Sequence, residues 1–214
     1  MPKKVVVVGS GNAALSAGIA ALEKGADVVI YEKADKKMAG GNTKYTAGAM
    51  RFSYENGDQL IDLLKHPDDK RIKDTDFGTY TNEKFSLDLL NFNDGRPLSP
   101  EQNILVSKSF ETIQWLASHN VKFEPIYSRQ SFLKNGKHIF WGGLTLASEN
   151  EGVGLFDQEL AAFLSLGGEI HYNSPVTKLI FENHKVIGLL VDNKSVEADS
   201  VILASGGFEA VSYT

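Results

Sequence analysis

The chain has 214 residues, of which 42% are hydrophobic and 23% are charged, an ordinary globular composition. A formal net charge of -5 with no evident basic face argues against nucleic acid as the main partner. There is no cysteine, which excludes disulfides and thiol nucleophiles, and no apolar run approaches the roughly 20 residues that span a bilayer. We therefore expect a soluble, cytoplasmic protein with no membrane span.

The first elements in chain order form a βαβ unit over residues 4–33. Val5–Val8 is an apolar run typical of a buried parallel strand. Residues 12–24 have the apolar spacing of a helix, and Gly25 is placed to end it. A second apolar run at residues 28–31 predicts the next strand. Together these elements give the order strand, glycine turn, helix, strand.

The turn of this unit has the pattern of a dinucleotide site. Gly9 permits a tight turn, Gly11 lets the backbone approach a pyrophosphate, and the helix N-terminus attracts the phosphates. Glu32 follows Gly9 by 23 residues, close to the offset of about 20 for an acid that binds ribose hydroxyls, and it disfavours NADP. A glycine turn in some other α/β protein is the alternative. The expected binding residues here are Gly9, Ser10, Gly11, Asn12, Ala13, Ala14, Glu32 and Lys33.

A second glycine-rich segment, AGGNTKYTAGAMR, fills residues 39–51. Its small residues make a surface on which a flat ring can lie, while its amide and hydroxyl side chains supply hydrogen bonds. An ordinary surface turn is the alternative, but the short distance from the first motif favours a ligand site. The candidate residues are Gly40, Gly41, Asn42, Thr43, Thr46, Ala47 and Gly48.

A third motif, VILASGGFEA, fills residues 201–210 and predicts a buried strand that ends in a turn of small residues. The chain reaches it through a helix at about 155–166, a strand at 169–172 and a meander between 176 and 198. The candidate residues in this turn are Ala204, Ser205 and Gly206.

These three motifs together resemble the FAD-binding domain of the succinate dehydrogenase/fumarate reductase flavoprotein family. In that family the glycine–asparagine loop lines FAD, and the last turn reads Ala-Thr-Gly-Gly, with Ser205 here in place of Thr. The resemblance implies FAD rather than NAD, and a backbone contact from Val176 to the adenine end. It also implies an α/β, Rossmann-like fold, a parallel sheet with helices on both faces plus a β-meander. Residues 38–51 contain neither His nor Cys, so we expect noncovalent FAD.

The predicted domain organisation is one FAD-binding domain, its N-terminal portion, over residues 1–214. It contains the βαβ unit at 4–33, a helical insert at about 52–150, and the helix, strand and meander of 151–210. In the insert we expect helices at 82–90 and at 100–118. Ser99 should cap the second helix, whose predicted inner positions are Ile104, Phe110, Ile113 and Leu116.

The insert also bears on the branch of the family. GKHIFWGGLTL at residues 136–146, with YTNEKFSLDL and QWLASHNVKFEP, resembles the tricarballylate dehydrogenase branch. Fumarate reductases tend to carry a His-Arg-Pro segment before the glycines that correspond to Gly152 and Gly154, and this chain does not. We expect Phe140 and Trp141 to pack in the core. The alternative places Trp141 beside the substrate pocket.

The resemblance implies an FAD-dependent dehydrogenase that acts on a small polycarboxylic acid and passes electrons to an unidentified acceptor. Relatives continue into a capping domain with the catalytic arginine, so we expect a truncated form without this domain, and no catalytic residue is identified. The five histidines lack zinc-ligand spacing, which predicts no metal site. The alternatives are a fumarate reductase, a ketosteroid dehydrogenase-like enzyme, a flavoprotein linked to cobalamin biosynthesis, an NAD-binding protein, and a non-catalytic flavin-binding fragment.

Overall fold

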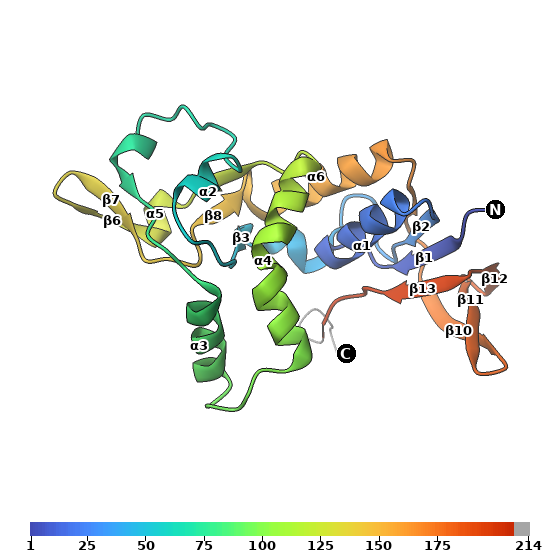
Figure 1. Cartoon of the computed structure of the whole chain (residues 1–214). Coiled ribbons are helices and arrows are strands. Elements are labelled where there is room, and N and C mark those ends of the chain that lie inside the picture. The colour runs from blue at the N-terminus through green and yellow to red at the C-terminus, as the bar shows by residue number, and fades with distance from the viewer. Residues whose placement is uncertain (208–214) are drawn as a thin grey trace, which may run out of the picture. The chain divides into compact units, whose positions relative to one another are not determined.

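The computed structural model describes residues 1–207, which form two compact units (Figure 1). The first unit contains Met1–Thr46 and the described part of Gly152–Thr214, and the second unit is Ala47–Glu151. The chain therefore leaves the first unit after its first 46 residues and returns to it at residue 152. Each unit is described by itself below.

The first unit is built on a four-stranded sheet of order β13-β1-β2-β9. Strand β1 (Lys4–Val8) pairs in parallel with β13 (Ser200–Leu203) and with β2 (Asp27–Tyr31), and β2 pairs in parallel with β9 (Glu169–His171). Parallel strands need crossover connections, and this sheet has them. The α/β class implied by the family resemblance is confirmed.

Helices α1 (Asn12–Glu23) and α6 (Glu151–Ser165) pack against each other in this unit. Gly18 on α1 permits their close approach, because a Cβ there would lie 2.8 Å from the ring of Phe163 on α6. Helix α1 ends at Glu23, one residue before the predicted end, and Gly25 follows its C-cap with a φ of +79°. A left-handed φ of this kind is what favours glycine after a helix.

The predicted meander consists of antiparallel strands β10 (Val176–Glu182), β11 (Lys185–Val191) and β12 (Lys194–Glu197). Its buried side chains form one cluster with Val6 of β1. Successive strand residues point to opposite faces, so Val7, which is fully buried, faces the other side of the sheet. The meander therefore covers one face of the sheet.

The second unit combines helices with two three-stranded sheets of order β3-β8-β5 and β4-β7-β6. Its longest helices lie where the sequence predicted them, and its other elements are short. In chain order the elements are β3 (Ala49–Met50), α2 (Asp58–Ile61), η2 (Ile72–Asp74), β4 (Thr75–Asp76), α3 (Asn82–Phe92), α4 (Pro100–Ser118), β5 (Phe123–Pro125), α5 (Tyr127–Gln130), β6 (Ser131–Lys134), β7 (Lys137–Phe140) and β8 (Leu146–Ser148).

Helix α4 begins as predicted but faces its core differently. Ser99 and Gln102 form a reciprocal capping box around Pro100, which confirms the predicted start. The predicted inner position of Ile104 is wrong, because this side chain is 63% exposed. The buried face instead consists of Val106, Ser109, Ile113 and Leu116, and Phe110 is half-buried. Ile104 lies outside that face because its spacing does not match the three- and four-residue steps of the stripe.

The expected core packing of the Phe140–Trp141 pair holds for one residue. Phe140 is 5% exposed and belongs to the core, whereas Trp141 is 62% exposed, so the core prediction for Trp141 is wrong. Strand β7 ends at Phe140, and the next side chain points away from the buried face. The indole packs at a tilt against Phe132, with ring centroids 5.3 Å apart.

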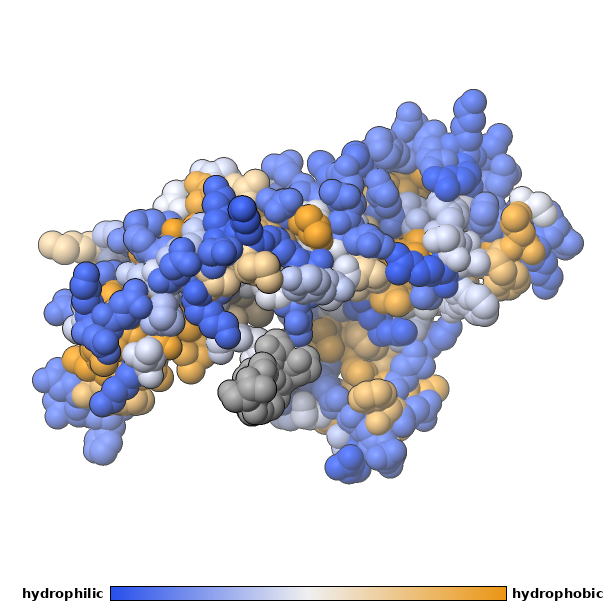
Figure 2. Space-filling model, turned by 180° about the vertical axis from the view of Figure 1, so that it is seen from behind, coloured by the Kyte–Doolittle hydropathy of each residue, from blue (hydrophilic) through white to orange (hydrophobic). Residues whose placement is uncertain are grey.

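The surface is mostly hydrophilic, with hydrophobic side chains reaching it in places (Figure 2). Four of the exposed hydrophobic residues come from α3 and α4, namely Leu87, Phe92, Ile104 and Leu105. Among residues 1–207, no helix combines the length and the apolar character needed to cross a membrane.

Candidate cofactor site

The ends of β1, β2 and β13 bring the first and third motifs together. Gly9 N donates to Tyr31 O and Ala204 N donates to Val8 O, each at 2.9 Å. Gly9 has a φ of +100°, and a Cβ at this position would overlap the carbonyl oxygen of Ala204. Only glycine fits this contact. Ligands of open α/β sheets bind at the carboxyl ends of the strands, which is where these turns lie.

The N-terminus of α1 is suited to an anion. Gly11 precedes the helix without a side-chain cap, and the first turn contains no acid. The backbone N–H of Asn12 donates to Thr43 Oγ1 at 2.9 Å, which joins the second motif to the first. A Cβ at Gly11 would lie 3.2 Å from Thr43 Oγ1 and 3.4 Å from the carbonyl oxygen of Gly40. Gly11 therefore lets the second motif pack closely against the start of α1, and the helix dipole favours a negative charge at this end.

The second motif folds into a 3-10 helix, η1 (Gly41–Tyr45), where the sequence predicted only a loop. Gly40 precedes it with a φ of +104°, and a Cβ there would lie 2.8 Å from the Phe156 ring on α6. Gly152 N donates to Thr46 O at 3.0 Å. Helix α6 thus supports η1, a role for Phe156 and Gly152 that sequence reasoning missed. The short Gly152–Gly154 spacing was the only available signal.

Glu32 and Ser10 form a buried polar pair between the motifs. Ser10 is 1% exposed and Glu32 is 7% exposed. The Ser10 hydroxyl donates to Glu32 Oε2 at 2.6 Å and accepts from Gly40 N at 3.0 Å, while Ala34 N donates to Glu32 Oε1 at 2.8 Å. Each carboxylate oxygen thus keeps acceptor capacity, and among residues 1–207 Glu32 has no ion pair. This donor and acceptor set fits the ribose hydroxyls of a dinucleotide.

Replacing Ser10 with alanine should destabilise the chain by about 1–3 kcal/mol, because Gly40 N–H and one oxygen of Glu32 would then lose a partner in a buried place. Urea unfolding measures the change. Ser205→Ala is the control, since Ser205 is exposed and should change stability by less than about 0.5 kcal/mol. Equal effects in the two variants would contradict this role of Ser10.

The remaining predicted residues divide into two groups. The first unit carries Ala13, Ala14, Lys33, Gly41, Asn42, Thr46, Val176, Ala204, Ser205 and Gly206, of which Val176 packs against the core of the meander. Ala47 and Gly48 belong to the second unit, where Gly48 is buried and its carbonyl oxygen accepts from Ser148 N at 2.9 Å. The role of each of these residues toward a cofactor stays a prediction. Residues 208–210 of the third motif lie outside the described residues.

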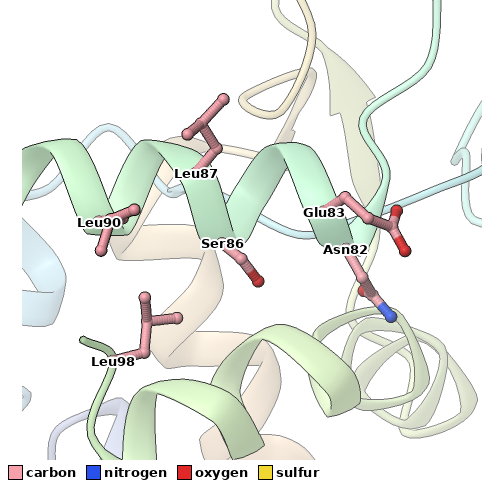
Figure 3. A pocket seen from close by; sticks show the side chains of 6 residues that line it. All are labelled: Asn82, Glu83, Ser86, Leu87, Leu90 and Leu98. Atoms are coloured by element: carbon pink, nitrogen blue, oxygen red, sulfur yellow. The ribbon is translucent and has the colours of Figure 1, made fainter. Parts of the chain in front are cut away.

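A groove in the second unit has no residue in common with this site. Figure 3 shows its lining, five residues of α3 and Leu98 from the segment before α4. Three of the six lining residues are leucines, and Glu83 is the one charged side chain among them. The groove therefore offers no cluster of groups suited to redox chemistry. Among residues 1–207, no three acidic or histidine side chains gather as a metal site, and His138 packs edge-on against Tyr127 with ring centroids 4.7 Å apart.

Comparison with known proteins agrees with this geometry. Residues 4–213 match the family described as FAD binding domain. A probable fumarate reductase of Shewanella frigidimarina, Ifc3, is 26% identical over 211 residues, which are 96% of this chain and 32% of that protein. The NADH:acrylate oxidoreductase of Vibrio harveyi is 27% identical over 96% of this chain and 24% of its own length.

A solved structure gives the same result. The open conformation of a flavocytochrome c3 fumarate reductase superimposes with a TM-score of 0.68 at 26% identity, over 97% of this chain and 34% of that one. The chain thus spans about a third or less of the length of these relatives. The glycine turns, the buried acid and these matches agree, and the chain belongs to the FAD-binding domain family of the succinate dehydrogenase/fumarate reductase flavoproteins.

Proposed function

We propose that this chain is the FAD-binding part of an FAD-dependent dehydrogenase that acts on a small polycarboxylic acid such as tricarballylate. The observation that supports it most is the meeting of Gly9, Gly11 and Thr43 around the N-terminus of α1, whose first turn carries no acid, with Glu32 buried nearby. When bound, FAD supplies the acceptor or donor of a hydride. The protein holds and orients it, and we expect noncovalent binding.

Each group of the site has a defined task in this proposal. The N-terminus of α1 attracts the pyrophosphate, and the carboxylate of Glu32 accepts hydrogen bonds from the ribose. Ser10 keeps that carboxylate in place from within the protein. Gly40 and Thr43 hold the second motif against the first, so that its small residues can face the flavin half of the cofactor.

The cofactor is tested by titration with FAD. We expect saturable binding, and we expect Gly11→Val to weaken it at least tenfold, because the added side chain would push Thr43 and Gly40 of the second motif away from the N-terminus of α1. Calorimetry or flavin fluorescence measures the dissociation constant. Ala20→Val, an exposed position on the same helix, should bind like the wild type. A wild-type chain that gives no heat and no saturation would refute the cofactor assignment.

Two cations in the second unit support a carboxylate substrate. Arg51 Nη1 donates to the Tyr80 hydroxyl at 3.0 Å and lies 3.5 Å from Asp88 Oδ2, while Lys84 Nζ lies 5.7 Å from the Tyr80 ring. Burial and the hydrogen bond to Asp88 together raise the pKa of Tyr80 to about 12. The phenol therefore stays protonated and remains a donor. Within residues 1–207, Nε and Nη2 of Arg51 have no protein partner, which leaves donors for a carboxylate.

The turn beside these cations has no side chains. Gly142 and Gly143 have φ values of +93° and +81°, and a Cβ at Gly143 would lie 2.7 Å from Arg51 Nη1. A Cβ at Gly142 would lie 3.6 Å from Lys84 Nζ. Arg51 and Tyr80 therefore pack so closely against this turn that only glycine fits at position 143, and Lys84 lies beside the same turn.

Arg51→Met and Lys84→Met are each expected to weaken the binding of tricarballylate about tenfold, since a charge-assisted hydrogen bond is worth roughly 1.5–3 kcal/mol. Calorimetric titration with tricarballylate measures this. Lys108→Met is the control, because Lys108 pairs with Glu111 on an exposed part of α4. Equal affinity in all variants would count against a carboxylate site here.

A non-catalytic flavin-binding fragment is the second candidate. It is favoured by the site residues of the first unit, which can hold a cofactor although no catalytic task is assigned to any of them. The fumarate reductases that this chain resembles also support a dicarboxylate substrate such as fumarate for the whole protein. Anaerobic bleaching of the bound flavin by tricarballylate would support a dehydrogenase. Reoxidation of the bleached flavin by fumarate would support a reductase. A flavin spectrum that neither acid changes would support the non-catalytic candidate. The electron acceptor and the cytoplasmic location stay predictions.

A further inference from the structure

A fully buried carboxylic acid contacts the N-terminal part of α1, next to the candidate cofactor site. Glu159 of α6 has 0% exposure, and among residues 1–207 it forms no ion pair. Ser16 Oγ donates to its Oε1 at 2.8 Å. One terminal atom of the Asn12 side-chain amide lies 2.8 Å from Oε1 and 3.1 Å from Oε2. Asn12 is the first residue of α1, so this carboxyl contacts the helix end that is proposed to bind the pyrophosphate.

No charge compensates Glu159 from the neighbouring elements within the described part of the chain. The two residues of α1 that contact it, Asn12 and Ser16, are uncharged. Lys44 of η1 lies over the Phe156 ring at 4.5 Å, and Glu32 after β2 bonds to Ser10 and Ala34. Burial raises the pKa of Glu159 to about 8, partly offset by the Ser16 hydrogen bond. The carboxyl is therefore mostly neutral at pH 7 and ionises in the mildly alkaline range.

The protonation of this acid determines how the Asn12 amide can be oriented. While Ser16 donates to Oε1, the proton of a neutral carboxyl is on Oε2, and the Asn12 atom 3.1 Å away must be the oxygen that accepts it. An ionised carboxylate only accepts, so the amide nitrogen must then face it. The two amide orientations have nearly the same shape, and the hydrogen-bond partner selects between them. In either orientation, the other amide atom points away from Glu159.

We propose that Glu159 is a positioning residue that sets the orientation of the Asn12 amide and thereby the affinity of the α1 N-terminus for the pyrophosphate of FAD. When Glu159 is neutral, the Asn12 nitrogen points outward and adds a donor for a phosphate oxygen. When Glu159 is ionised, the Asn12 oxygen points outward instead of the nitrogen, and the negative charge of Glu159 lies next to the positive end of the helix. Both effects weaken the binding of FAD. This inference rests on the proposed binding of FAD.

The test is the dissociation constant of FAD at pH 7 and pH 9, measured by fluorescence titration. If only the neutral form binds well, the affinity of the wild type should fall about tenfold between these two values. Glu159→Gln keeps the shape and is neutral at both pH values. We expect it to bind FAD at pH 9 as well as at pH 7.

Two further variants complete the experiment. Glu182→Gln makes the same chemical change at an exposed position, and it should keep the tenfold pH dependence and correct for titration of the flavin itself. Asn12→Ala should bind more weakly at pH 7 and show a smaller pH dependence than the wild type, because only the charge of Glu159 then acts, which tests the amide even if Glu159→Gln fails to fold. The same pH dependence in Glu159→Gln or Asn12→Ala as in the wild type overturns this inference alone. No binding of FAD by the wild type at either pH overturns the proposed function as well.

Discussion

Replacing Gly152 with alanine should destabilise the first unit by about 3 kcal/mol. The added Cβ would overlap the carbonyl oxygen of Thr43 and lie 2.6 Å from Oγ1 and 2.8 Å from the carbonyl oxygen of Thr46. These are mostly backbone atoms, so either η1 or the start of α6 must move. Overpacking of this kind typically costs about 1–3 kcal/mol, and rigid neighbours place it at the upper end. Urea unfolding followed by circular dichroism measures the loss.

A neighbouring substitution provides the control for Gly152→Ala. Val153 follows on the same helix and is 44% exposed, so Val153→Ala should change the free energy of unfolding by no more than about 0.5 kcal/mol. Movement of η1 also displaces Thr43, which bonds to the first residue of α1. We therefore expect Gly152→Ala to bind FAD more weakly as well. Wild-type stability and affinity in Gly152→Ala would contradict the close packing of the start of α6 against η1.

The free energy of unfolding should fall as the pH rises from 5 to 9, and Glu159 should cause most of that fall. Its pKa is raised from 4.5 to about 8 by burial, with an opposing contribution from Ser16. Because the folded protein binds the proton of Glu159 more tightly than the unfolded chain does, this contribution to stability is complete below the pKa of the unfolded state, 4.5. It is lost as the pH rises to the pKa of the folded state, about 8. The loss is on the order of 3–5 kcal/mol, because a difference of one between the folded and unfolded pKa values corresponds to about 1.4 kcal/mol.

Urea unfolding at pH 5, 7 and 9 measures this dependence. Glu159→Gln removes the titrating group, so its stability should change much less over the same range, and it should be more stable than the wild type at pH 9. Glu182→Gln, the exposed counterpart, should follow the wild type at each pH. A wild type whose stability is constant from pH 5 to pH 9, or falls equally in Glu159→Gln, would show that Glu159 is not buried as a neutral acid.

The sequence alone determined the features that depend on neighbouring residues. Gly9 and Gly11 predicted the tight turn between β1 and α1, and Glu32 the acid after β2, because each meets a backbone or spacing requirement within a single βαβ unit. Ser99 and Pro100 predicted the start of α4 in the same way, through a hydrogen bond over three residues. The meander follows from apolar runs that are separated by turn residues. These signals are local, so no other part of the chain is needed to read them.

Only the tertiary structure decided which distant residues meet. The contact of Ser16 with Glu159 joins positions 143 residues apart, and neither residue has a pattern that points to the other. The same holds for Gly152 against η1. Ile104 and Trp141 are exposed because the buried face of a helix or strand is set by the elements that pack against it, and these two side chains lie outside that face. Local propensity specifies an element, whereas burial and partner choice arise when the chain folds back on itself, because packing energy depends on both surfaces.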